Sequence, residues 1–157
     1  MQGDDAVLVL GLGNRLLGDD AAGPLAVDAL AAAAGARFAR YRDGGTIGLS
    51  LLPQIEDAAA FIAVDAALFG ATPGTVRVFE GAAMDDQLGG RKRSAHEVAL
   101  ADLMAAAAFN GRLPARRALV AVEPASTALG LALTPAVDAA LPRLCTAVNE
   151  LLDRWTN

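Results

Sequence analysis

Three short, uninterrupted apolar runs lie far apart in the sequence, at residues 6–10, 61–64 and 118–122. An apolar run of four or five residues that ends at a glycine or a charged residue is typical of a strand buried on both faces. Residues 37–42 predict another strand. The alternating Thr-Val-Arg-Val-Phe pattern of residues 75–79 predicts a half-exposed strand, at an edge or in an antiparallel pairing. The chain is therefore expected to build a sheet of about five strands.

Helical patterns occupy most of the sequence between these strands. The predicted helices cover residues 23–34, 49–57, 96–109 and 134–155, whereas residues 81–94 predict no regular structure. Strands that alternate with helices favour a twisted, mostly parallel sheet. We therefore expect an α/β fold in which a single three-layer domain, spanning residues 1–157, carries helices on both faces of the sheet.

Charge and composition argue against several classes of function. The chain has 157 residues and a net charge of −5, whereas proteins that bind nucleic acids usually present a basic face. Its apolar stretches are shorter than the ~20 residues that span a bilayer, and residues 1–5 are too acidic for a signal peptide. The single cysteine, Cys145, fits a reducing compartment. We expect a cytoplasmic protein without nucleic-acid or membrane partners.

Carboxylates follow the first three predicted strands. Asp19 and Asp20 end the loop after the first strand, Asp43 follows the second, and Asp65 follows the third. In parallel sheets, ligands bind in the crevice beyond the carboxyl ends of the strands. The sequence therefore predicts an acidic site at this edge of the sheet.

The loop after the first strand also resembles the start of a nucleotide-binding turn, because it opens with Gly-x-Gly. Leu16, however, replaces the third glycine that close packing of helix and strand would need. Asp19 and Asp20 would also repel a phosphate by about 1 kcal/mol per close charge pair in water, and by more when desolvated. A Rossmann-like nucleotide-binding module is kept as an alternative.

His96 is the only histidine of the chain and lies at the start of a predicted helix. A lone histidine is often structural, and a carboxylate at Asp19 or Asp20 can serve simply as a helix cap. Together with Asp65, however, they offer oxygen and nitrogen donors that suit a divalent Zn, Ni or Fe ion with open coordination positions. Without a metal, two carboxylates could act as an acid–base pair.

Four ordered motifs resemble those of the endopeptidases that mature [NiFe]-hydrogenase large subunits. Residues 11–23 match the opening motif G-x-G-N-x-L-x-x-D-(D/E)-x-x-G, and residues 43–46 (Asp-Gly-Gly-Thr) match a glycine loop. Residues 64–66 match a second acidic motif, and Ser-Ala-His-Glu at residues 94–97 matches a histidine motif. Four motifs at matching spacing are more specific than any one of them.

The resemblance implies that the chain removes a C-terminal peptide from the precursor of a [NiFe]-hydrogenase large subunit after nickel insertion. It implies that Asp20, Asp65 and His96 are the catalytic and metal-contacting residues. The nickel could belong to the protease or arrive with the precursor, another divalent metal such as Zn is possible, and metallo- and aspartic-type mechanisms both stay open. A non-catalytic chaperone of the nickel-loaded precursor is a further alternative.

The glycine loop allows two interpretations. Glycines let a substrate backbone come close, so Gly44, Gly45 and Thr46 could bind the precursor. The same three residues could also form no more than a tight turn.

Overall fold

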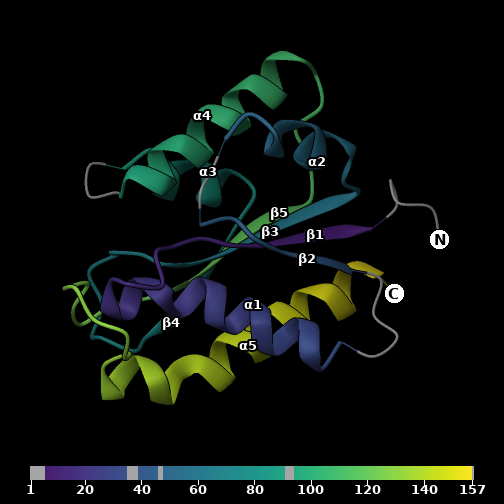
Figure 1. The fold of residues 1–157 in the computed structure, drawn as a ribbon. Coiled ribbons are helices and arrows are strands. Elements are labelled where there is room, and N and C mark those ends of the chain that lie inside the picture. Colours follow the sequence, from purple (N-terminus) through teal and green to yellow (C-terminus); the bar gives the residue numbers. More distant parts are fainter. Residues whose placement is uncertain (1–5, 35–38, 46–47, 91–93, 157) are drawn as a thin grey trace.

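The computed structural model describes residues 6–34, 39–45, 48–90 and 94–156 (Figure 1). Its centre is a five-stranded sheet with the order β2-β1-β3-β5-β4. The strands are β1 (Val7–Gly11), β2 (Ala39–Asp43), β3 (Ala60–Ala66), β4 (Val76–Glu80) and β5 (Arg117–Val122). Four of them run parallel, whereas β4 pairs antiparallel with β5 at one edge. The predicted strand number and the edge position of residues 75–79 are thereby confirmed.

Helices cover both faces of the sheet (Figure 1). Helices α1 (Ala22–Ala32) and α5 (Pro135–Thr156) lie on one face. The opposite face carries α2 (Leu51–Asp57), α3 (Ala82–Leu88) and α4 (Ala95–Phe109). The predicted three-layer α/β architecture is therefore confirmed.

The strands are apolar on both sides because each side packs against helices. In β1, Val7 and Val9 contribute to the core beneath α1 and α5, whereas Leu8 and Leu10 contribute to the opposite core. Successive side chains of a strand point to opposite faces, so a continuous apolar run satisfies both cores at once. This requirement explains the runs from which the strands were predicted.

Two local predictions were wrong. Residues 81–94 were expected to be irregular, but Ala82–Leu88 form helix α3, with Met84 and Leu88 buried at i, i+4 spacing. The third strand was expected to end at Asp65, but β3 continues to Ala66. The site carboxylate therefore stands within a central strand and not in the turn after it.

No helix in the described part of the chain is both long enough and apolar enough to cross a membrane.

Candidate metal centre and active site

The loop after β1 places Asp20 beside the carboxyl ends of the central strands. Gly13 has a φ of 135°, and a Cβ atom there would lie 1.8 Å from the carbonyl oxygen of Asp20, so only glycine fits. The backbone N–H of Asn14 donates to Oδ2 of Asp20 at 2.7 Å. This hydrogen bond fixes one carboxylate oxygen of Asp20 and leaves Oδ1 facing His96.

A short 3-10 helix, Gly18–Ala21, then leads into α1, which packs tightly on the sheet. At Gly23, a Cβ atom would lie 2.3 Å from the carbonyl oxygen of Val64 and 2.4 Å from that of Leu12. The last glycine of the opening motif therefore brings the start of α1, and with it Asp20, against the central strands.

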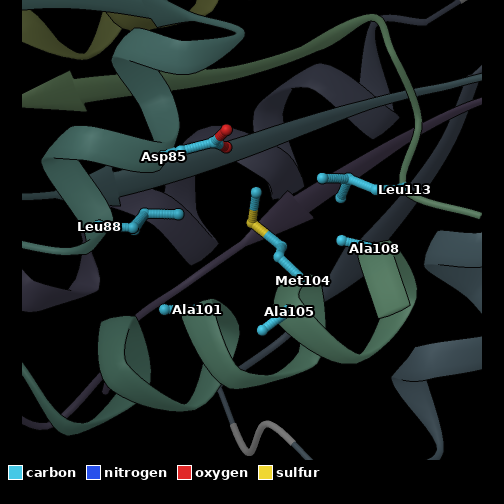
Figure 2. Close-up of a pocket in the computed structure, with 7 residues that line it drawn as sticks. All are labelled: Asp85, Leu88, Ala101, Met104, Ala105, Ala108 and Leu113. Atoms are coloured by element: carbon cyan, nitrogen blue, oxygen red, sulfur yellow. The ribbon is translucent and has the colours of Figure 1, made fainter. Parts of the chain in front are cut away.

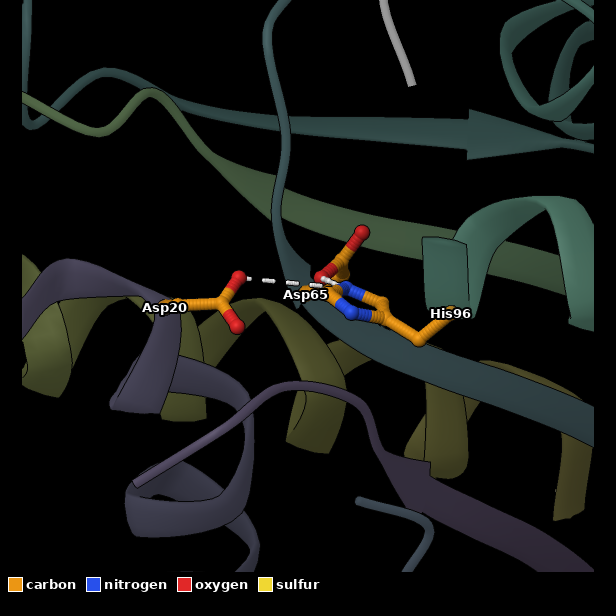
Figure 3. Close-up of side chains that lie close together, drawn as sticks. All are labelled: Asp20, Asp65 and His96. Carbon is orange, nitrogen blue, oxygen red and sulfur yellow. Dashed lines mark hydrogen bonds and ion pairs between the residues drawn. The ribbon is translucent and has the colours of Figure 1, made fainter. Parts of the chain in front are cut away.

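His96 completes the constellation from the first turn of α4 (Figure 3). Its Nε2 atom lies 3.0 Å from Oδ1 of Asp65 and 3.9 Å from Oδ1 of Asp20. Ser94 caps the helix by accepting the N–H of Glu97, which fixes the direction in which the helix starts. The structure thus brings together the three predicted ligand residues from β3 and two helix starts.

The electrostatics of the site are dominated by burial. The side chain of Asp65 is fully buried, and this burial, reinforced by the negative charge of Asp20, holds the pKa of Asp65 well above its ordinary value. Burial and the neighbouring Asp65 likewise raise the pKa of Glu97 to about 8. A hydrogen bond between Glu97 and Asp65 raises the pKa of Glu97 and lowers that of Asp65. Because the pKa of both acids is raised, the pair holds a proton between its two carboxyl groups near neutral pH.

The three donors fit a divalent cation. Oxygen or nitrogen atoms bound at about 2.1 Å to one ion lie roughly 3.0–3.5 Å from one another. One ligand atom from each of Asp20, Asp65 and His96 lies within 4.8 Å of the others, and the His96–Asp65 separation is already in this range. Because two acids and one imidazole leave further coordination positions open, the arrangement suits catalysis or substrate contact more than a closed structural site.

Asp19, the other member of the acidic pair, is not a cap of the helix that follows it, because neither Gly18–Ala21 nor α1 has a side-chain cap. Its buried carboxylate instead accepts hydrogen bonds from the backbone N–H groups of Ala125, Ser126 and Thr134 and from the Thr134 hydroxyl. Burial by itself would raise the pKa of Asp19, but these hydrogen bonds outweigh it and lower that pKa.

The sequence interpretation did not foresee the roles of two buried acids beside the site, Asp19 as an anchor and Glu97 as a neighbour of Asp65. Asp19 acts through residues more than 100 positions away, which no local pattern reveals. Glu97 did leave a signal, because it lies three residues before the buried Leu100 and seven before Met104, on the apolar stripe of α4.

The predicted glycine loop lies beside the opening loop. The Gly44 N–H donates to the Gly11 carbonyl at 2.7 Å, and a Cβ atom at Gly45 would lie 3.0 Å from the Gly13 carbonyl oxygen. A Cβ atom at Gly44 would lie 2.7 Å from the Leu10 side chain, so a larger residue has little space at either glycine. Thr46, the third residue of this predicted substrate-binding set, lies outside the described residues.

A separate, mainly apolar pocket of about 220 Å³ lies between α3 and α4 (Figure 2). Leu88, Met104 and Leu113 contribute to its wall, and none of the three donor residues lines it. It is therefore distinct from the constellation at the strand ends.

Comparisons with known proteins agree with the geometry. The family model of hydrogenase maturation proteases (HycI) matches residues 31–151. The chain belongs to the hydrogenase maturation protease family. It is 37% identical over 150 residues to the hydrogenase expression/formation protein HupD of Rhodobacter capsulatus, covering 94% of this chain and 71% of that protein. It is 35% identical over 153 residues to the hydrogenase 2 maturation protease of Escherichia coli, covering 92% and 91% of the two chains.

The fold of the family is retained as well. The structure of the hydrogenase maturating endopeptidase HybD from Escherichia coli superposes with a TM-score of 0.87 at 32% identity, covering 95% of this chain and 93% of HybD. The resemblance inferred from the four sequence motifs is thus confirmed, and so is the prediction of an endopeptidase. In the Gly-x-Gly loop that suggested nucleotide binding, the Asn14 N–H is already bound to Asp20.

Proposed function

We propose that this hydrogenase maturation protease removes a C-terminal peptide from the precursor of a [NiFe]-hydrogenase large subunit after nickel has been inserted. The observation that carries the proposal is the convergence of Asp20, Asp65 and His96 within 4.8 Å at the carboxyl ends of the strands. Family membership supports the peptidase chemistry and the hydrogenase partner.

Asp20, Asp65 and His96 are the residues that would contact nickel. The nickel is either carried by the precursor or held by the protease, and Zn is the other ion that this donor set suits. A bound divalent ion supplies Lewis-acid chemistry, because it polarises a scissile carbonyl and lowers the pKa of water toward about 7.

The chain's own residues prepare this chemistry. The Asn14 N–H orients Asp20, and Glu97 holds a proton against Asp65, so each carboxylate keeps one oxygen free toward His96. Asp65 and Glu97 form a buried acid pair of the kind that can accept or donate a proton near neutral pH. The donor set and the acid pair therefore support metallo- and aspartic-type routes alike.

Substrate binding is assigned to the glycine loop. Gly44 and Gly45 lie beside the opening loop that carries Asp20. Glycines let a substrate backbone come close, which supports a role of this loop in binding the precursor. Thr46 is included in this proposal because it continues the same motif. We place the reaction in the cytoplasm, since the single Cys145 fits a reducing compartment.

The test is a processing assay with purified protein and purified, nickel-loaded large-subunit precursor. Mass spectrometry should detect a shortened precursor and a released C-terminal peptide. The His96→Ala form should leave the precursor intact, whereas Phe109→Ser, a change at an exposed position at the far end of α4, should cut normally. A wild-type protein that binds the precursor without cutting it would instead indicate a chaperone.

A further inference from the structure

Exposed leucines gather at the edge of the sheet that carries the donor residues. The exposed fractions of these leucines range from 50% to 83%. Each leucine lies in a loop that follows the carboxyl end of a parallel strand: Leu16 after β1, Leu49 after β2, Leu68 after β3, and Leu129 and Leu131 after β5. Large exposed apolar side chains that gather at one place mark interaction sites more often than scattered ones do.

The loop between β5 and α5 is an uncharged part of this edge and carries two of the exposed leucines. Residues 124–134 contain no charged side chain, although 20% of the whole chain is charged, so about two charges would be expected in eleven residues. Leu129 is 83% exposed and Leu131 is 82% exposed. The segment therefore presents leucines to solvent without the charges that usually solvate such a loop.

This segment is held firmly to the site. Gly130 donates its N–H to the Leu16 carbonyl at 2.8 Å and accepts the Gly18 N–H at 3.0 Å. The buried carboxylate of Asp19 binds backbone N–H groups near both ends of the segment, at Ala125 and Thr134. A loop that is already ordered loses little conformational entropy when a partner covers it.

The anchor and the proposed metal ligand are neighbours in sequence. Asp19 fixes the leucine-bearing segment, and Asp20 faces His96. Gly18, two residues before Asp20, also donates its N–H to the Gly130 carbonyl, so the segment lies next to the start of the helix that carries Asp20. Because the segment adjoins the donor residues, the molecule that covers it is the substrate. Because the segment carries no charge, the part of the substrate that contacts it is apolar.

We propose that Leu16, Leu129 and Leu131 form a docking ridge, here called the leucine ridge, which binds an uncharged, apolar segment of the hydrogenase precursor next to the bond that is cut. The proposal rests on the proposed function, because it takes the precursor as the substrate. The ridge contributes binding and positions the precursor, while the donor residues carry the chemistry.

The test compares the double variant Leu129→Ser/Leu131→Ser with Phe109→Ser in the processing assay. Phe109 is a matched control, because it is 92% exposed but ends α4, whose 15 residues carry it about 20 Å from the helix start near the site. The double variant should raise the KM for the precursor about tenfold, with kcat reduced less than about twofold, and Leu16→Ser should act in the same direction. Phe109→Ser should change neither. An unchanged KM in the double variant would overturn the proposal.

A binding measurement separates this proposal from the proposed function. Isothermal titration of the precursor into His96→Ala protein, with and without the two leucine changes, measures docking where no cutting occurs. The leucine changes should weaken binding about tenfold. If wild-type protein does not cut the precursor, the proposed function fails. If the leucine changes leave the affinity for the precursor unchanged, the leucine ridge is rejected, whatever the result of the cleavage assay.

The ridge could instead join two copies of the chain, and sedimentation of both proteins decides this. A wild-type dimer that the leucine changes convert to monomer, with unaltered affinity for the precursor, would overturn the proposal. A wild-type monomer together with the loss of affinity supports it.

Discussion

Two buried acids lie against each other beside the site, Glu97 in the first turn of α4 and Asp65 in the central strand β3. Oδ1 of Asp65 faces His96, and Oε1 of Glu97 accepts the Ser94 hydroxyl. The remaining oxygens, Oδ2 of Asp65 and Oε2 of Glu97, are buried and have no hydrogen-bond partner among the described residues. Buried polar atoms are rarely left without a partner, and we infer that the two acids share a proton.

The first prediction concerns pH and stability. Because the pKa of Glu97 is raised to about 8, the folded protein keeps a proton that the unfolded chain loses above about pH 4.5. The free energy of unfolding of metal-free protein should therefore fall as pH rises from about 5 to 8, by on the order of 1 kcal/mol per pH unit at most. Urea denaturation at several pH values measures this slope.

Glu97→Gln should flatten the dependence of the free energy of unfolding on pH. Glu150→Gln, a change at an exposed position, should leave that dependence as in the wild type. Equal slopes in all three proteins would refute the shared proton.

A second prediction concerns Asp65 itself. Asp65→Asn keeps the shape of the side chain but removes an ionisable group that is fully buried and close to Asp20. We expect precursor cleavage to fall by about 100-fold or more, while the melting temperature at pH 8 stays at or above that of the wild type, because functional sites commonly trade stability for activity. Calorimetry and the processing assay measure the two effects. A variant that cuts normally would show that Asp65 is not part of the site.

A third prediction tests the anchoring role of Asp19. Asp19→Ala leaves three backbone N–H groups and one hydroxyl without the carboxylate they now share. The expected loss of stability is about 2–4 kcal/mol, since buried donors without partners are costly. Asp138→Ala, a change at an exposed acid in the first turn of α5, should cost no more than about 1 kcal/mol. Urea denaturation compares the two, and similar losses would contradict an anchoring role.

The sequence predicted the sheet better than it predicted the site. Apolar runs such as Val7–Leu10 identify their strands because burial on both faces demands an uninterrupted pattern. Helix α3 was not predicted, because only Met84 and Leu88 of its seven residues are buried, too few to give a clear helical pattern of apolar residues. Short helices depend on tertiary packing more than on local preference.

For the site, the types of residue were visible but their partners were not. Nothing local distinguishes Asp19 from Asp20, since both are buried acids in the same short helix. Their roles diverge because one carboxylate meets Thr134 and the other faces His96, and both contacts are set by the folded chain. The family resemblance supplied the choice of Asp20 that residue patterns alone left open.

The last prediction concerns metal binding by the proposed ligands. Titration calorimetry with Ni²⁺ and with Zn²⁺ should give weaker binding for Asp20→Ala and His96→Ala than for wild-type protein, by about tenfold or more, because each change removes one of three donors. Glu97→Gln should weaken binding less, since it alters only the hydrogen bond to Asp65. Asp28→Ala, which removes an exposed acid bound to Arg15, is the control and should have no effect on metal binding.

If the wild-type protein binds neither ion, but His96→Ala still abolishes cleavage of the nickel-loaded precursor, then His96 contacts the metal only when the substrate brings it. If binding and cleavage are both unaffected by Asp20→Ala and His96→Ala, the ligand assignment is wrong.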